Sequence, residues 1–194
     1  SHIPLHLGSL MGSVGAVLEA YPAERMAEGD VFICNDPWLC NGQTADVFIT
    51  TPAFHEGRLI GFAINTVHHV DIGGRKGSGL SEEVYEEGLI IPQLRLYDAG
   101  VPNEMLFAII RRNVRFAEKM IGDLRAQIAT GWFGSREMER LAAEFGMEDL
   151  RDGYPRYGYW TASPRNNSGT FTYSEEGLLT SHEGVAATGL QLTR

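Results

Sequence analysis

Apolar residues near the start of the chain recur at the spacing of an α-helix. Between Leu7 and Tyr21 they are separated by steps of three and four positions. This period places them on one face of a helix, so the pattern predicts an amphipathic helix here. Pro22 follows directly, and proline cannot continue the hydrogen-bond ladder of a helix. We therefore expect the helix to end before Pro22.

After Gly29 and Asp30 the pattern changes to short runs rich in β-branched and aromatic residues. These runs predict three strands, over residues 31–34, 47–51 and 59–67, with a turn at residues 55–58 joining the last two. Each run is apolar almost throughout, which is typical of strands that are covered on both sides. We therefore expect other elements to pack on both faces of the sheet.

The second half of the chain changes from loop and strand patterns to helical ones. Residues 71–88 predict a glycine-rich loop with one helical turn at 81–85, and strand pieces at 89–91 and 94–96 flank Pro92, as at a sheet edge or bulge. Asn103 is predicted to cap a helix. A longer helical region is predicted to follow and to end at Gly146, with Asp123, Arg125 and Gln127 on its solvated polar face. From Arg151 onward, turn-forming residues dominate and periodicity is weak.

These elements predict an α+β fold with a mixed β-sheet, an N-terminal helix and a C-terminal helical segment. We assign residues 1–150 to one domain and residues 151–194 to a divergent tail that is irregular or disordered.

Charge and cysteine content narrow the range of functions. The formal net charge of -9 argues against nucleic acid and anionic membranes as partners, since both are bound mainly through clusters of Lys and Arg. No apolar run approaches the roughly 20 residues needed to span a bilayer. Cys34 and Cys40 are too few for a disulfide scaffold in a chain of 194 residues. We therefore predict reduced cysteines and a cytoplasmic location.

Polar residues that can bind a metal or transfer protons lie at the ends of the predicted strands. Asp46 begins the second strand and His68 ends the third, so a hairpin between these strands places a carboxylate beside an imidazole. Such a pair is the smallest protein ligand set expected for Mn, Fe or Zn, with water or substrate in the open positions. Spacing alone nevertheless favours a structural interpretation, in which Asp46 starts a strand and His68 is a surface histidine.

Three neighbouring polar residues leave alternatives open. His69 follows His68, and adjacent residues on a strand point to opposite faces, so both cannot bind one metal; His69 is instead a candidate orienting group or proton shuttle. Asp71 lies in the turn beyond. Asp36 is either the cap of a turn or a carboxylate that faces the site. We find no convincing nucleophile triad and no phosphate-binding glycine motif, so ATP is not expected to bind this chain.

Several ordered motifs of this chain resemble the hydantoinase B/oxoprolinase family. The resemblance is collinear from about Ile3 to Gly146. The segments that carry it are Gly29-Asp30-Val31 with Asn35-Asp36-Pro37-Trp38, Ile60-Gly61-Phe62-Ala63 with His68-His69-Val70-Asp71-Ile72-Gly73-Gly74, Glu86-Glu87-Gly88-Leu89-Ile90-Ile91-Pro92, Leu96-Tyr97-Asp98-Ala99-Gly100, and Gly122-Asp123-Leu124-Arg125-Ala126-Gln127.

The resemblance implies a subunit, or a C-terminal half, of an ATP-dependent enzyme that opens cyclic amides such as hydantoins and 5-oxoproline. It implies that ATP is used by a partner, a hydantoinase A-type subunit with an actin-like fold, in a hetero-oligomer. Related family members are large subunits of acetone and acetophenone carboxylases, which gives an alternative function. A third interpretation is an inactive truncated product that has only an interaction role.

The resemblance also assigns residue roles. The metal-binding positions are Gln43, Asp46 and His68, and we predict Asp36, His69 and Asp71 to transfer protons or to orient groups. Gln43 stands where the family has a histidine, and a neutral amide oxygen is a weaker ligand. We therefore expect a divalent metal (Mn, Zn or Fe) to bind weakly, to use His69 or Asp71 instead, or to be lost. Family members are several hundred residues long, and the resemblance ends near Arg151, so we expect a truncated, incomplete domain.

Overall fold

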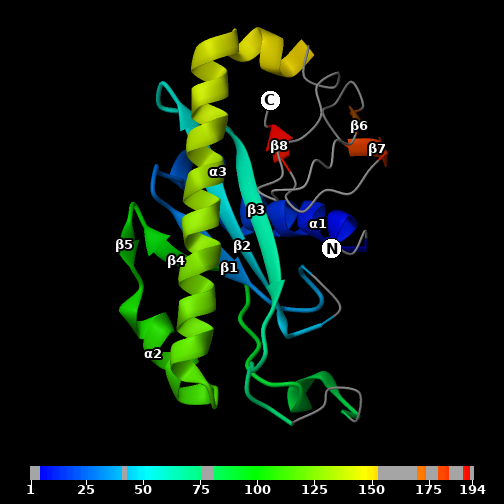
Figure 1. Cartoon of the computed structure of the whole chain (residues 1–194), viewed down its shortest axis with the longest axis vertical. Helices are drawn as coiled ribbons and strands as arrows, with labels where there is room; N and C mark the ends of the chain where they lie inside the picture. Colours follow the sequence, from blue (N-terminus) through cyan, green and yellow to red (C-terminus); the bar gives the residue numbers. More distant parts are fainter. Residues whose placement is uncertain are drawn as a thin grey trace.

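A β-sheet with helices on both faces forms the centre of the computed structural model, which describes residues 5–40, 43–75, 81–152, 170–173, 179–183 and 190–192 (Figure 1). The sheet has the strand order β5-β4-β1-β2-β3-β8. Its strands are β1 Val31–Cys34, β2 Asp46–His55, β3 Arg58–His68, β4 Leu94–Asp98, β5 Val101–Pro102 and β8 Leu190–Leu192. The predicted α+β class is confirmed. The predicted mixed sheet is not, because every pairing between described strands is antiparallel.

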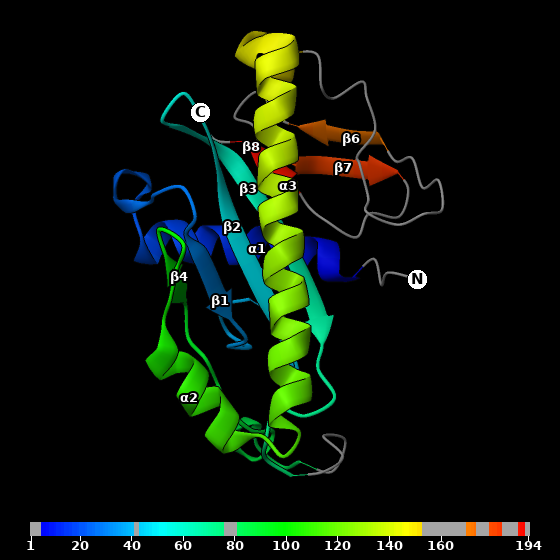
Figure 2. The ribbon, with the colours of Figure 1, turned by 60° about the vertical axis from the view of Figure 1, so that its left-hand side comes forward.

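Three helices cover this sheet. The first, α1 (Leu5–Ala20), lies on the face opposite α3 (Ala117–Asp152), and α2 (Glu104–Asn113) lies beside the lower part of α3 (Figures 1 and 2). As predicted, α1 ends before Pro22, and Asn103 caps α2 by accepting a hydrogen bond from the Leu106 amide at 3.1 Å. The backbone leaves helical geometry at Gly146, where φ is 77°, so the direction of α3 changes at its predicted end.

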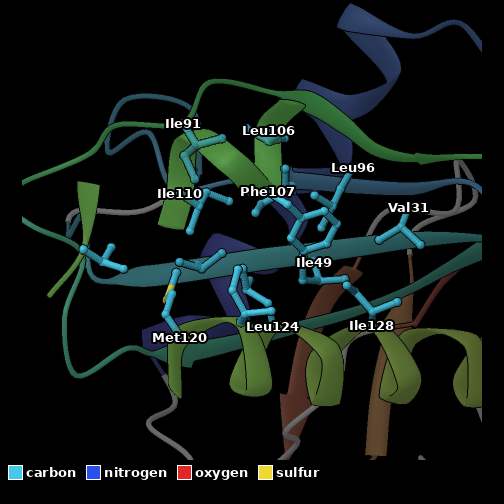
Figure 3. Close-up of a cluster of buried hydrophobic side chains, with 14 of the residues drawn as sticks. Val31, Ile49, Ile91, Leu96, Leu106, Phe107, Ile110, Met120, Leu124 and Ile128 are labelled. Atoms are coloured by element: carbon cyan, nitrogen blue, oxygen red, sulfur yellow. The ribbon is translucent and has the colours of Figure 1, made fainter. Parts of the chain in front are cut away.

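Side chains of the central strands alternate between two apolar clusters, as the prediction of a sheet covered on both faces requires. Along β2, Val47 and Ile49 belong to the cluster under α2 and α3, whereas Phe48 belongs to the cluster under α1. Figure 3 shows the first cluster, in which Met120, Leu124 and Ile128 of α3 point toward the sheet. Burial on both faces makes the β2–β3 pair the rigid centre of the described fold.

Strands β2 and β3 form the predicted hairpin, and both are longer than the sequence indicated. Glu56 and Gly57 have φ values of 50° and 75°, the left-handed geometry of a tight two-residue turn. The register then pairs Asp46 with His68 at the open end of the hairpin. The two-residue turn and the register shift between Ala53 and Phe54 set this pairing, because turn type and loop length determine which residues of a hairpin face each other.

Other regions differ from the sequence-based expectations. Residues 89–91 are not a strand, although they run beside the end of β1, and the predicted helical turn is a short 3-10 helix, η3 (Val84–Glu86). A second short 3-10 helix, η1, spans Ala23–Arg25. In the described part of the tail, β6 (Thr170–Tyr173) pairs with β7 (Leu179–Glu183), and β8 adds to the edge of β3. The domain boundary at residue 150 stays a prediction.

Both cysteines are free and buried, with Cys34 in β1, as the prediction of reduced thiols requires. In the part of the chain that the structure describes, no helix is both long and apolar enough to cross a bilayer.

Helix α3 packs closely on β2 at Gly131. A Cβ atom added there would lie 2.3 Å from Oγ1 of Thr51 and 3.2 Å from its Cβ. Such contacts are too short for a packed interior, so a glycine is needed where α3 crosses β2.

We predict that Gly131→Ala destabilises the protein. Alanine gains about 1 kcal/mol of helix propensity, but overpacking against Thr51 costs about 1–3 kcal/mol, so the free energy of unfolding in urea should fall. Gly122→Ala in the same helix is the matched control, because no atom lies within 4 Å of its added Cβ, and it should raise stability. Equal stabilisation by both variants would contradict the close approach.

Candidate functional site

A buried amide holds together the three segments that surround the open end of the hairpin. Asn35, directly after β1, is fully buried. Its Nδ2 donates to the carbonyl oxygens of Thr44 at 2.6 Å and Leu89 at 2.9 Å, and its Oδ1 accepts from the Ile91 amide at 2.5 Å. The backbone amide of Asn35 also donates to Ile91 at 3.0 Å. One side chain therefore fixes the loop before β2 against residues 89–91.

A second contact anchors the same loop. Oε2 of Glu87 accepts from the Thr44 hydroxyl at 2.7 Å and from the Thr44 amide at 3.3 Å. Thr44 lies two residues before Asp46, so this carboxylate and the amide of Asn35 together determine where β2 begins. Glu87 was part of a family-like motif in the sequence, but its contact with residue 44 is visible only in the fold.

Asp46 and His68 face each other across the open end of the hairpin. Oδ1 of Asp46 lies 2.7 Å from Nδ1 of His68, and the side chain of Asp46 is 3% exposed whereas that of His68 is 60% exposed. The predicted juxtaposition of carboxylate and imidazole is therefore present. A buried acid with an accessible imidazole suits a ligand that approaches from solvent, with carboxylate and imidazole as suitable donors for Mn, Fe or Zn.

His69 lies on the other face of the sheet, as strand alternation predicted. Its Nε2 lies 2.8 Å from Oε1 of Gln127 on α3, and Nε2 of Gln127 contacts Val47 O at 2.9 Å and Oδ1 of Asn65 at 3.0 Å. His69, Gln127 and Asn65 are all buried. Gln127 was interpreted from sequence as part of a solvated helix face. That interpretation is wrong, because this face of α3 packs on the sheet.

Burial lowers the pKa of His69 below the ordinary histidine value, and the charge of His68 acts in the same direction. The hydrogen bond to Gln127 and the negative charges of Asp123 and Asp46 raise the pKa, but by less than burial lowers it. His69 is therefore a neutral imidazole at pH 7.

Asp71 anchors the start of α3. Its carboxylate accepts hydrogen bonds from the amides of Gly73, Phe116 and Arg115, and its Oδ1 also lies 2.9 Å from Nη1 of Arg115. Burial alone would raise the pKa of Asp71, but these hydrogen bonds outweigh burial and hold the pKa below the ordinary value. The guanidinium of Arg115 also bonds to the carbonyl oxygens of Gly73 and Gly74. The contacts described for Asp71 are thus structural ones.

Asp36 and Gln43 occupy the loops before the hairpin. Oδ1 of Asp36 accepts from the Trp38 amide at 3.0 Å, which is the turn cap considered from the sequence. Gln43 is exposed, and its backbone oxygen accepts from the Asp46 amide at 3.2 Å. This backbone hydrogen bond holds Gln43 in a turn directly before the start of β2 at Asp46.

The glycines of the family-like motif pack against backbone. A Cβ at Gly73 would lie 2.5 Å from the carbonyl oxygen of Asn113, and one at Gly74 would lie 2.4 Å from that of Glu86. Both have positive φ. These two glycines are required by the fold at this point, because any side chain would collide with the neighbouring segments.

The structure brings Asp46 and His68 into contact. The side chains of His69 and Asp71 form their described hydrogen bonds with other residues, Gln127 and Arg115 among them. Among the residues that the structure describes, no three His, Cys, Asp or Glu side chains gather closely enough to hold a metal ion. Of these residue types, only Asp46 and His68 are left as candidate metal ligands in the described part of the site. Gln43 is the third ligand position that the sequence predicts. The roles predicted for all six site residues stay predictions.

We predict that Asp71→Asn lowers the free energy of unfolding at pH 7 by about 3 kcal/mol, because the amide group loses the ion pair and turns a donor toward other donors. A carboxyl whose folded pKa is depressed contributes stability above its unfolded pKa and loses it as pH falls through the folded value.

The wild-type protein should therefore lose stability below about pH 4, and Asp71→Asn should lack that part of the loss. Urea unfolding at pH 3 to 7 measures this, with exposed Glu118→Gln as the control. A parallel pH dependence of the wild type and Asp71→Asn would contradict the anchor.

Comparison with known proteins shows to which family the chain belongs. The sequence profile described as hydantoinase B/oxoprolinase matches residues 1–156. The caprolactamase subunit beta of Pseudomonas jessenii is 32% identical over 152 residues, which are 77% of this chain and 26% of that protein. The crystal structure of the ATP-dependent caprolactamase from the same organism aligns with 98% of this chain and 36% of that chain, with a TM-score of 0.71 and 26% identity.

The nucleotide-free structure of acetone carboxylase, which carries out ATP-dependent acetone carboxylation, is a further match. It aligns with 73% of this chain and 20% of that chain, with a TM-score of 0.63 and 25% identity. The chain thus spans about a quarter of the length of this caprolactamase subunit. The profile match, which covers most of the chain and contains every residue of the candidate site, assigns this protein to the hydantoinase B/oxoprolinase family.

Proposed function

We propose that this chain is the hydantoinase B-type part of an enzyme that opens cyclic amides with ATP. The observation that carries the proposal is the likeness to an ATP-dependent caprolactamase, which covers 77% of this chain in sequence and 98% of it in fold. Caprolactam, hydantoins and 5-oxoproline share a cyclic amide bond, so we propose hydrolysis of a C–N bond in a ring as the reaction class. A cytoplasmic location fits the use of ATP.

The chain carries no phosphate-binding glycine motif, so we propose that a partner uses ATP. This partner would be a hydantoinase A-type subunit in a hetero-oligomer, and it would phosphorylate the carbonyl oxygen of the amide. The present chain would then orient the activated ring and direct water to its carbonyl carbon. A C–O bond would form as the ring C–N bond breaks, the nitrogen would leave as an amine after taking up a proton, and a second water would release the phosphate from the resulting acyl phosphate to give the ring-opened acid. Orientation by a rigid scaffold is a large part of catalysis, and the buried β2–β3 hairpin is such a scaffold.

Asp46 and His68 are the residues that we propose to hold a divalent metal, with Gln43 as a third, weaker ligand. Support comes from their donor chemistry and from the 2.7 Å contact that places both at the open end of one hairpin. A metal bound there would act as a Lewis acid on the amide carbonyl. Binding of the ion by both side chains would replace the 2.7 Å hydrogen bond between them, and the exposed His68 would meet the ion first.

The roles proposed for the other polar residues follow their surroundings. His69, neutral and buried, is the group proposed to accept a proton or to orient water. Asp36 and Asp71 stay candidates from the family resemblance, and the hydrogen bonds described for them support positioning of the Trp38 turn and of α3.

We predict that Gln43→His raises the affinity for Zn²⁺ by about tenfold or more, because imidazole is a better ligand than a neutral amide oxygen for this ion. Asp46→Ala and His68→Ala should each abolish specific binding, measured by calorimetry and by metal content after dialysis. His55→Ala, at the far end of the same hairpin, is the matched control. Equal affinities in the wild type, Gln43→His and His68→Ala would refute the proposed ligand set.

Coexpression with a hydantoinase A-type partner tests the function. We expect a complex whose ATPase rate rises at least tenfold with a cyclic amide and whose product is the ring-opened acid, detected by mass spectrometry. His68→Ala should remove this stimulation.

The likeness to acetone carboxylase favours one alternative, carboxylation of a ketone. Product formation that requires bicarbonate and a ketone would establish that alternative in place of ring opening. A complex that forms but hydrolyses no ATP with either substrate class would support the inactive interpretation.

A further inference from the structure

Two backbone carbonyl groups fix the orientation of the buried amides beside His69. Nε2 of Gln127 donates to the carbonyl oxygen of Val47 at 2.9 Å, and Nδ2 of Asn65 donates to that of Gln127 itself at 3.0 Å. A backbone carbonyl oxygen can only accept hydrogen bonds. Rotating either amide by 180° would therefore place two oxygens against each other. The remaining contact agrees, since Oδ1 of Asn65 accepts from Nε2 of Gln127 at 3.0 Å.

This orientation determines the tautomer of His69. The atom of Gln127 that faces the ring is Oε1, which lies 2.8 Å from Nε2 of His69. Because Oε1 can only accept, Nε2 must carry the hydrogen. In a neutral imidazole one nitrogen is the donor and the other the acceptor, so Nδ1 presents a lone pair.

Nδ1 of His69 is buried and, among the described residues, has no hydrogen-bond partner. The whole residue is only 3% exposed. Buried polar atoms in proteins are almost always paired, and leaving one unpaired costs about 1–3 kcal/mol. The lone pair is thus held in place by three hydrogen-bonded side chains and is open to a donor from a bound water or a ligand.

We infer that Gln127 is a positioning residue that keeps His69 in the Nε2–H tautomer, so that Nδ1 can accept a hydrogen bond from the substrate or its water. Asn65 supports Gln127, and the backbone amide of His69 is itself fixed to the Ala45 carbonyl at 2.8 Å. The assignment of His69 to substrate rests on the proposed function, whereas the tautomer and its dependence on Gln127 do not.

The hydrogen-bonded group of Asn65, Gln127 and His69 is distinct from the Asp46–His68 pair. Asp46 and His68 occupy paired positions of the hairpin, on the same side as Phe48 and α1, whereas Gln127 contacts His69 from α3 on the other side. The two histidines therefore serve opposite faces of one strand end. Losing Gln127 should leave metal binding by Asp46 and His68 unchanged.

The test is ¹⁵N NMR of the full chain labelled at histidine, with His69→Gln to assign the signals. In the wild type we expect a pyrrole-type Nε2 resonance and a pyridine-type Nδ1 resonance for His69. Gln127→Leu should convert this to a mixture of tautomers or to the Nδ1–H form. Gln127→Glu, which keeps an oxygen acceptor, should retain the Nε2–H tautomer. Thr51→Val, a buried polar change under the same helix, should alter nothing.

A pyrrole-type Nδ1 in the wild type, or an unchanged tautomer in Gln127→Leu, would overturn the inference. If Gln127→Leu does not fold, Gln127→Met replaces it, because this variant keeps the length of the side chain but removes the amide oxygen that accepts from Nε2 of His69, and it should also yield mixed tautomers or the Nδ1–H form.

In the coexpressed complex, Gln127→Leu should lower kcat at least tenfold while KM for ATP stays unchanged, and Gln127→Glu should restore part of the rate. Absence of activity in the wild-type complex would count against the proposed function. The NMR result would still decide whether Gln127 sets the tautomer of His69.

Discussion

The buried side chain of Asn35 is the contact on which the geometry of the candidate site depends. Its three side-chain hydrogen bonds join the end of β1 to the loop before β2 and to residues 89–91. No secondary structure joins these three segments at this point, so the amide supplies the pairing that a strand would otherwise provide. Removing it would leave two buried backbone groups, of Thr44 and Ile91, without this partner, at about 1–3 kcal/mol each, and a partly buried one at Leu89. The position of Asp46 follows from this clamp.

The open end of the β2–β3 hairpin carries candidate functional side chains on both of its faces. On the α1 side, Asp46 and His68 form an acid–imidazole pair that is accessible through the imidazole. On the α3 side, His69 is buried and held by Gln127. Asp71 then bonds to the start of α3, and Gly131 lets the same helix approach β2 closely. Helix α3 is thus fixed at its start and along its length, which in turn fixes the atoms of Gln127 against His69.

The sequence predicted the parts of this arrangement that depend on local periodicity. The short apolar runs and the turn at residues 55–58 predicted the hairpin, and the hairpin alone brought Asp46 to His68. The N-cap at Asn103 and the break at Gly146 are also local signals. These features needed no information about distant segments.

Long-range contacts were not predictable in the same way. Gln127 was interpreted as solvated because a single polar residue beside Leu124 and Ile128 fits either edge of the apolar stripe. Only the rotation of α3 on the sheet decides between them. The contact of Glu87 with Thr44 spans 43 residues and leaves no periodic trace. The mixed sheet was wrong because strand direction depends on the path of connections, which hydrophobic patterning does not record.

The central claim is that Asp46 and His68 are presented together as ligands for one metal ion. Pulsed electron paramagnetic resonance of the chain loaded with Mn²⁺ tests it directly, because an imidazole ligand gives nitrogen modulation of the echo. The wild type should show modulation from a histidine nitrogen, and His68→Ala should lose it while His55→Ala keeps it. Mn²⁺ bound without nitrogen modulation, or with modulation that persists in His68→Ala, would contradict the account.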